Sequence, residues 1–236
     1  MTARTFCALW LLLLPALLLP AADVVQLDVR AVLNGRAVTT LTGTNRLVPW
    51  DRGIDGGGRA DGYMTAEAAA ANGDLNAHAL PGDGSFVAND AHPAVKLNFS
   101  NADGKNSQVR SVAGAGEFSF AVSTNRYQRL FVFMTSAEGS SHLTFTLTYA
   151  DGTVEPRPIL LPDYYNAPAA GDTNIFCLAT NLAKWNAAGR MAERDHHNIH
   201  GVVISTDAGK ALVSIQVEKT APGYLVFWGA TGVTAD

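Results

Sequence analysis

Short apolar or alternating runs recur along the whole chain, and clusters of glycine, asparagine and aspartate separate them. Such runs are typical of β-strands, and the intervening residues are typical of turns. Polar and apolar residues alternate in 144–149 (Thr-Phe-Thr-Leu-Thr-Tyr), and Asp151-Gly152 shortly afterwards predicts a hairpin turn. The clearest expected strands are 24–30, 94–99, 117–122, 129–134, 142–149, 153–161, 174–179, 201–205, 212–218 and 223–228.

The order of these runs predicts an all-β protein. Strands do not alternate with helices, and neither an internal repeat nor a linker interrupts them. We therefore expect one domain over 23–236, built as a jelly-roll β-sandwich. One or two short helices are expected beside it: 65–72 is rich in alanine, whereas 182–193 is interrupted by Gly189, which limits it to a turn or two.

The first residues have the three parts of a cleavable export signal. Arg4 precedes an apolar run over 6–20, and the small residues Ala21 and Ala22 follow it. The run is shorter than the roughly 20 residues that a membrane-spanning helix needs. We therefore expect a signal peptide over 1–22, secretion to an extracellular or periplasmic location, and no stable membrane anchor.

Charge and cysteine content narrow the classes of partner and of fold. The formal net charge is −4, which disfavours nucleic acid and anionic membranes because both attract a basic face. Without its signal the chain keeps roughly 214 residues, enough for one core. Cys177 is then the single cysteine, so no disulfide forms within the chain, and we expect the stability to come from the core.

Several segments follow one another in an order that resembles the galactose-binding-like jelly-roll modules of secreted bacterial glycosidases. The matching segments are 55–67 (Asp-Gly-Gly-Gly-Arg-Ala-Asp-Gly-Tyr-Met-Thr-Ala-Glu), 127–133 (Tyr-Gln-Arg-Leu-Phe-Val-Phe), 148–153 (Thr-Tyr-Ala-Asp-Gly-Thr), 163–166 (Asp-Tyr-Tyr-Asn), 210–215 and 225–227. The resemblance covers most of the mature chain. It implies a jelly roll that binds carbohydrate, often with a structural calcium ion near the first of these segments. It is weakly specific for activity, because this fold carries many functions.

The segment 193–200 (Glu-Arg-Asp-His-His-Asn-Ile-His) concentrates three of the six histidines beside carboxylates. On a helix, His196 and His200 would share one face, as in zinc sites; on a strand, they share a face that His197 does not. The apolar run after His200 favours the strand. We expect Asp195 and the three histidines to hold a loop or contact a sugar, with Zn²⁺ binding and acid–base catalysis as the less favoured alternatives.

The glycine-rich segment 51–67 is a candidate calcium site. Its oxygen ligands would come from four carboxylates: Asp51, Asp55, Asp61 and Glu67. Calcium prefers such hard oxygen ligands, and glycine allows backbone carbonyls to turn toward an ion. The spacing is not that of an EF-hand, so a plain turn cluster remains the alternative. If the protein holds a metal ion, we expect a structural Ca²⁺ at this segment rather than Zn²⁺ at the histidines.

Aromatic side chains in expected loops form the third group of candidates. They are Trp50, Tyr63, Tyr165 and Trp185. Sugars bind by placing their C–H faces on aromatic rings, while carboxylates and amides bind the hydroxyls. These aromatics and the segment of Asp195, His196, His197 and His200 are therefore the expected ligand-binding residues.

Three functions are compatible with these patterns. We favour a secreted carbohydrate-binding protein that recognises an extracellular or cell-wall glycan. The first alternative is a small polysaccharide-cleaving enzyme, a lyase or hydrolase, in which Tyr165 acts with His196 or His197 as base and acid. The second is a non-catalytic structural protein of the envelope or matrix. Neither the glycan nor the oligomeric state follows from the sequence.

Overall fold

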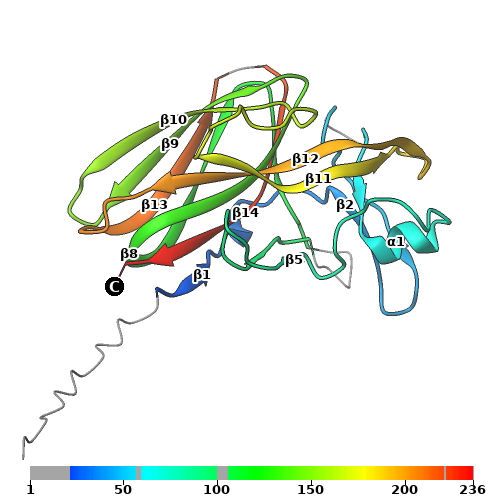
Figure 1. Ribbon diagram of the computed structural model, residues 1–236, viewed down its shortest axis with the longest axis horizontal. Helices are drawn as coiled ribbons and strands as arrows, with labels where there is room; N and C mark the ends of the chain where they lie inside the picture. The colour runs from blue at the N-terminus through cyan, green and yellow to red at the C-terminus, as the bar shows by residue number, and fades with distance from the viewer. Residues whose placement is uncertain (1–21, 57–59, 100–105, 221, 236) are drawn as a thin grey trace, which may run out of the picture.

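The computed structural model describes residues 22–56, 60–99, 106–220 and 222–235 (Figure 1). These residues form an all-β protein with one short α-helix, as expected from the sequence. The expected signal peptide lies outside the described residues, apart from Ala22. Within the described part of the chain, no helix has the length and apolar character needed to cross a membrane.

The largest element is a nine-stranded sheet whose paired strands are all antiparallel. Six of its strands follow the order β1-β14-β8-β13-β9-β10, while β12 pairs with β8 and β11, and β7 pairs with β14. Their bounds are β1 Val24–Gln26, β7 Arg110–Ala113, β8 Gly116–Ala137, β9 Ser141–Tyr149, β10 Val154–Leu161, β11 Ile175–Trp185, β12 Met191–Ser205, β13 Ala211–Lys219 and β14 Tyr224–Thr234.

Strand β8 spans 22 residues and joins two parts of the sheet. Its first half pairs with β13, from Gly116 opposite Lys219 to Arg126 opposite Ala211. Its second half pairs with β14 on one side and with β12 on the other. The middle of the sheet is therefore built around the second half of β8, and β9 and β10 extend it beyond β13 (Figure 1).

Alternation along β8 explains why its residues 130–134 are apolar at every position. Leu130, Val132 and Met134 belong to one buried cluster, together with side chains of β9, β13 and β14. Phe131 and Phe133 point to the opposite face and belong to a second cluster. A strand buried on both faces reads as a continuous apolar run rather than an alternating one. The two parts of the large sheet share the first cluster.

The N-terminal part of the chain covers the second face of the sheet. It contributes Val38, Ile54, Leu80 and Phe99 to the second cluster, where Phe99 meets the ring of Trp228 edge-on at 6.5 Å. Its regular elements are short: a 3₁₀ turn η1 (Arg30–Val32), strands β2 (Val38–Leu41), β3 (Leu47–Val48), β4 (Tyr63–Met64), β5 (Ser85–Phe86) and β6 (Val95–Lys96), and helix α1. The expected strands 24–30 and 94–99 are therefore only partly strand.

Helix α1 (Ala66–Ala71) confirms the helix expected at 65–72. Thr65 caps it, because its side-chain oxygen accepts a hydrogen bond from the backbone N–H of Ala68 at 3.2 Å. Ala68 and Ala69 are buried in a small third cluster with two tryptophans, Trp50 and Trp185. The helix is thus packed against the region where the β11–β12 hairpin ends.

The second expected helix, 182–193, is wrong. Strand β11 continues to Trp185 and β12 begins at Met191, so the segment is the tip of a hairpin. Asn186 and Arg190 close the turn through a backbone hydrogen bond of 2.9 Å, and Gly189 has a φ of +72°. Glycine adopts that left-handed conformation without strain, and strand pairing overrides the local helix tendency.

Candidate functional site

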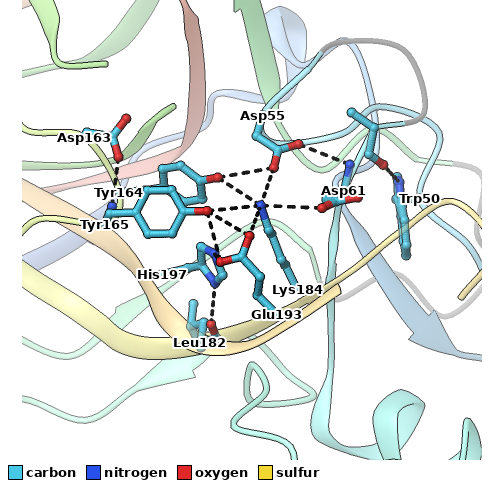
Figure 2. A network of polar contacts seen from close by, with 11 residues as sticks. Trp50, Asp55, Asp61, Asp163, Tyr164, Tyr165, Leu182, Lys184, Glu193 and His197 are labelled. Carbon is cyan, nitrogen blue, oxygen red and sulfur yellow. Dashed lines mark hydrogen bonds and ion pairs between the residues drawn. The ribbon is translucent and has the colours of Figure 1, made fainter. Parts of the chain in front are cut away.

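A cluster of polar side chains surrounds Lys184, near the tip of the β11–β12 hairpin (Figure 2). The ammonium nitrogen lies 2.9 Å from a carboxylate oxygen of Asp55 and 2.9 Å from one of Glu193. A carboxylate oxygen of Asp61 lies further away, at 3.5 Å. We call these four residues, with Tyr164, Tyr165 and His197, the Lys184 cluster.

Exposure increases from the centre of the cluster outward. The side chain of Lys184 is 7% exposed and that of Asp55 is 11% exposed. Asp61 is 25% exposed and Glu193 is 39% exposed. Tyr165, at 46%, is among the large hydrophobic side chains of the described residues that the fold leaves open to solvent. The cluster therefore has a buried ammonium at its base and acidic and aromatic groups at its surface.

The hairpin brings Lys184, Glu193 and His197 together. Lys184 pairs with Glu193 across the two strands, and Leu182 pairs with His197. The register shifts between these two pairs, and His196 has a φ of +83° within the irregular stretch of β12. Leu182 and Lys184 are two positions apart on β11, whereas their partners His197 and Glu193 are four positions apart on β12. Such an irregularity in the pairing redirects the side chains beside it. Glu193 and His197 consequently lie on the same side, with 3.4 Å between their closest nitrogen and oxygen.

The loop that carries Asp55 and Asp61 is attached to the same hairpin by backbone contacts. Gly62 and Trp185 exchange two backbone hydrogen bonds of 2.9 Å and form an isolated bridge. Within the loop, the backbone N–H of Asp61 donates to the Asp55 carboxylate at 3.1 Å, and that of Ile54 donates to the Asp61 carbonyl at 2.8 Å. Asp55 and Asp61 therefore reach Lys184 from a segment far away in the sequence.

The tyrosines come from a corner between β10 and β11 whose backbone is held on both sides. The Asp163 carboxylate accepts hydrogen bonds from the N–H groups of Gly139 and Tyr165, at 2.7 and 3.0 Å. The Tyr164 carbonyl accepts two from Asn198, at 2.8 and 2.9 Å. These contacts hold the two rings over the cluster.

Each tyrosine hydroxyl bonds a different carboxylate. Tyr164 donates to Asp55 at 3.2 Å, and Tyr165 lies 2.8 and 3.0 Å from the two oxygens of Glu193. Lys184 donates to both hydroxyls, at 3.2 and 3.4 Å, and lies 5.6 and 5.7 Å from the two ring centres. The ammonium thus interacts with both rings as well as with the carboxylates.

The surroundings determine the protonation states. Burial by itself lowers the pKa of Lys184, but hydrogen bonds to Glu193 and Asp55 raise it above its usual value. Burial raises the pKa of Glu193, but the bonds from Lys184 and Tyr165 bring it below its usual value. The pKa of Asp61 is raised, by burial and by the neighbouring charge of Asp55. Negative charge is thus only partly compensated around Asp61.

His197 is completely buried and carries its proton on a defined nitrogen. Its Nδ1 lies 2.7 Å from the carbonyl oxygen of Leu182, which only accepts, so Nδ1 is the donor. Burial lowers the pKa of this imidazole, which leaves Nε2 without a proton near neutral pH. Among the described residues, Nε2 has no hydrogen-bond partner, although Glu193 lies 3.4 Å away without hydrogen-bond geometry. A proton-accepting nitrogen therefore faces the cluster.

Three of the expected ligand-binding aromatics lie in the core instead. Trp50, Tyr63 and Trp185 are at most 3% exposed. The indole of Trp50 donates to the Ala60 carbonyl at 3.0 Å, and that of Trp185 donates to Asp74 at 2.8 Å. Their burial leaves no exposed ring face for a sugar, so Tyr165 is the one of the four with an accessible ring.

The other expected residues of the histidine segment separate from one another. Asp195 and His196 form an exposed pair with each other. His200 is buried, and its Nε2 lies 3.0 Å from the Asn166 carbonyl, so it helps to hold the tyrosine corner. Burial lowers the pKa of this histidine also. Of the three histidines, only His197 reaches the Lys184 cluster.

The four expected calcium ligands do not converge either. Asp55 and Asp61 lie at Lys184, whereas Asp51 pairs with Arg36 at 3.1 Å. Glu67 is on helix α1, and its carboxylate lies against Gly82. In the described parts of the chain, no group of three or more His, Cys, Asp or Glu side chains has an arrangement that could hold a metal ion. Calcium and zinc binding stay predictions.

The sequence analysis assigned no role to Lys184 or Glu193, and it selected Tyr165 as a site residue without its neighbour Tyr164. Lys184 was not recognised as a site residue because its segment, 182–193, was interpreted as a helix. The one usable signal is the Tyr164-Tyr165 pair, which stands in the segment 163–166 that carries part of the resemblance.

Comparison with known proteins provides no relative: no protein-family model and no curated protein matches this sequence.

Proposed function

We propose that the protein is an exported carbohydrate-binding protein, and that its glycan contacts the exposed side of the Lys184 cluster. We further propose that its fold is a jelly-roll sandwich of the galactose-binding-like kind. The buried cluster shared by the two parts of the large sheet supports that assignment. Export is the part of the proposal that depends on the sequence of residues 1–22.

One observation carries the proposal: a half-exposed aromatic ring stands directly beside two partly exposed carboxylates. Tyr165 is 46% exposed, and its hydroxyl bonds Glu193, which shares Lys184 with Asp61. A ring can receive the C–H face of a sugar, and carboxylates accept hydrogen bonds from its hydroxyls. This combination of one apolar face and several acceptors is typical of small polar-ligand sites.

The cluster is held in place before any ligand arrives. Asp163 and Asn198 hold the peptide group between Tyr164 and Tyr165, and Glu193 holds the Tyr165 hydroxyl. Binding to groups that are already ordered costs little conformational entropy, which benefits weak ligands such as sugars. The rigidity of the corner therefore supports recognition.

Binding of the mature protein to a panel of neutral, amino and acidic polysaccharides tests the proposal. Tyr165→Ala removes the ring, and we expect it to weaken binding by about 1 kcal/mol, or about fivefold in Kd. Leu160→Ala is the matched control, because Leu160 is exposed on β10 to a similar degree. Undetectable binding to every polysaccharide, or equal losses in both variants, would contradict a glycan site at Tyr165.

A second candidate function is glycan cleavage, favoured by the proton-accepting Nε2 of His197. The rings of His197 and Tyr165 lie 5.0 Å apart, so a base and a hydroxyl stand side by side. Glycan cleavage would release new chain ends over time, and His197→Gln should abolish the release. A wild-type protein that binds a glycan but releases no ends would leave binding as the function.

A further inference from the structure

We propose that the Lys184 cluster recognises a sugar with a free primary ammonium group, as in a glycan that contains unacetylated amino-sugar residues. The inference deepens the proposed function and rests on it. It follows from three features of the cluster: its balance of charges, the position of Asp61, and the buried Nε2 of His197, which lacks a hydrogen-bond partner among the described residues.

The cluster holds more negative than positive charge. One ammonium, that of Lys184, forms ion pairs with three carboxylates, those of Asp55, Asp61 and Glu193. Among the described residues, no other Lys or Arg forms an ion pair with any of these carboxylates. Glycans with carboxylate or sulfate groups would be repelled, and a cationic ligand would be attracted.

Asp61 is the carboxylate that a ligand can best complement. Lys184 is closer to Asp55 and Glu193, at 2.9 Å each, than to Asp61, at 3.5 Å. The Asp61 side chain is 25% exposed, so it can be reached from solvent. Burial and the neighbouring charge of Asp55 raise the pKa of Asp61 despite Lys184, which agrees with incomplete compensation of its charge. An ammonium placed at Asp61 would supply the missing positive charge through charge-assisted hydrogen bonds.

The Nε2 nitrogen of His197 gives independent support for a cationic ligand. It is a completely buried acceptor directed at Glu193, and it has no hydrogen-bond partner in the described part of the chain. Buried acceptors without a partner are uncommon and often mark a ligand or a catalytic role. This nitrogen and the two partly exposed carboxylates, Glu193 and Asp61, are all acceptors, which suits the three N–H donors of an ammonium.

Tyr165 favours an amino sugar over a lysine side chain as the source of that ammonium. Its ring is the exposed aromatic surface next to the carboxylates, and the C–H face of a sugar ring can lie on it while the amino group of the sugar reaches Glu193 or Asp61. A lysine chain offers no comparable face. We therefore assign the ammonium to a glycan, and a lysine-rich peptide is tested as the competing source.

The test compares two oligosaccharides of equal length, one of glucosamine and one of N-acetylglucosamine, by titration calorimetry on the mature protein. We expect the glucosamine oligosaccharide to bind about tenfold more tightly or better, with a preference that decreases as salt is added. Asp61→Asn should remove most of the preference. Asp90→Asn, at an exposed aspartate in another loop, should retain it. Melting temperatures of both variants establish that they are folded.

Each remaining outcome contradicts a defined part of the reasoning. Equal binding of the two oligosaccharides, or a preference that survives in Asp61→Asn, would overturn the ammonium inference and leave glycan binding intact. Binding of neither oligosaccharide nor any polysaccharide would overturn the proposed function itself. Polylysine that binds as tightly as the glucosamine oligosaccharide, with the same dependence on Asp61, would replace the glycan by a basic peptide.

Discussion

Replacing Lys184 with methionine would remove the positive charge that holds the cluster together. Methionine has a similar length, so packing changes little, but Asp55, Asp61 and Glu193 would face one another without a cation. Two tyrosine hydroxyls would also lose the donor that reaches them. The variant therefore isolates the electrostatic contribution of one buried ammonium.

The expected loss follows from how deeply the groups are buried. Removing one partner of a buried ion pair costs about 3–5 kcal/mol, because the other charge is left uncompensated. Asp55, 11% exposed, accounts for most of this loss. Glu193, 39% exposed, contributes less because water screens it. A loss near 3 kcal/mol is a large fraction of ordinary stability and would lower the Tm by about 10 °C in a domain of this size.

Urea unfolding of the wild type and of Lys184→Met, followed by tryptophan fluorescence at several pH values, measures this difference. Glu193 has a lowered pKa in the folded protein, so its stabilising effect is present above its unfolded pKa and is lost as the pH falls through the folded value. The gap between the two proteins should therefore be widest at neutral pH and should narrow below about pH 4. A gap under about 1 kcal/mol at neutral pH, or one that does not vary with pH, would refute the reasoning.

Two further substitutions test other parts of the fold. Asp61→Asn should increase stability at neutral pH by about 0.5–1 kcal/mol, because the raised pKa of Asp61 means that folding disfavours its charge. Thermal melts should show that this gain vanishes in acid, where Asp61 is protonated in both states. A loss of stability at neutral pH would contradict the charge balance described for the cluster. Gly201→Ala would place a methyl carbon less than 3.0 Å from Cζ of Phe176, so urea unfolding should show a loss of about 1–3 kcal/mol. Phe176→Leu should restore part of this loss, and an unchanged midpoint in Gly201→Ala would contradict the close contact.

The sequence predicted most of the strands and the helix at 65–72, because their signals are local. The alternation at 144–149 and the Asp-Gly turn after it correspond to β9 and the start of β10. Thr65 and the alanines behind it contain both the cap and the helix. The segment 182–193 was misinterpreted, because neither its pairing into a hairpin nor the φ of Gly189 can be read from residue types alone.

The candidate site was predicted only in fragments, because its members come from three distant segments. Asp55, Tyr165 and His197 were each selected for their own chemistry, and no local pattern placed them together. Lys184, which unites them, resembles any surface lysine in the sequence. Its burial depends on the bridge between Gly62 and Trp185 and on the paired strands β11 and β12, which are tertiary facts.

Strand β8 has a consequence for how the protein unfolds. Its residues alternate between the two large buried clusters, so Leu130 and Phe131 are covalent neighbours in different cores. Neither core can open without displacing the strand that the other one needs. The two cores should therefore behave as a single cooperative unit, with the slowest amide hydrogen exchange in the second half of β8. The corner that carries Tyr165 is attached to this strand through the bond from the Tyr164 N–H to the Ser136 carbonyl, so it shares that protection.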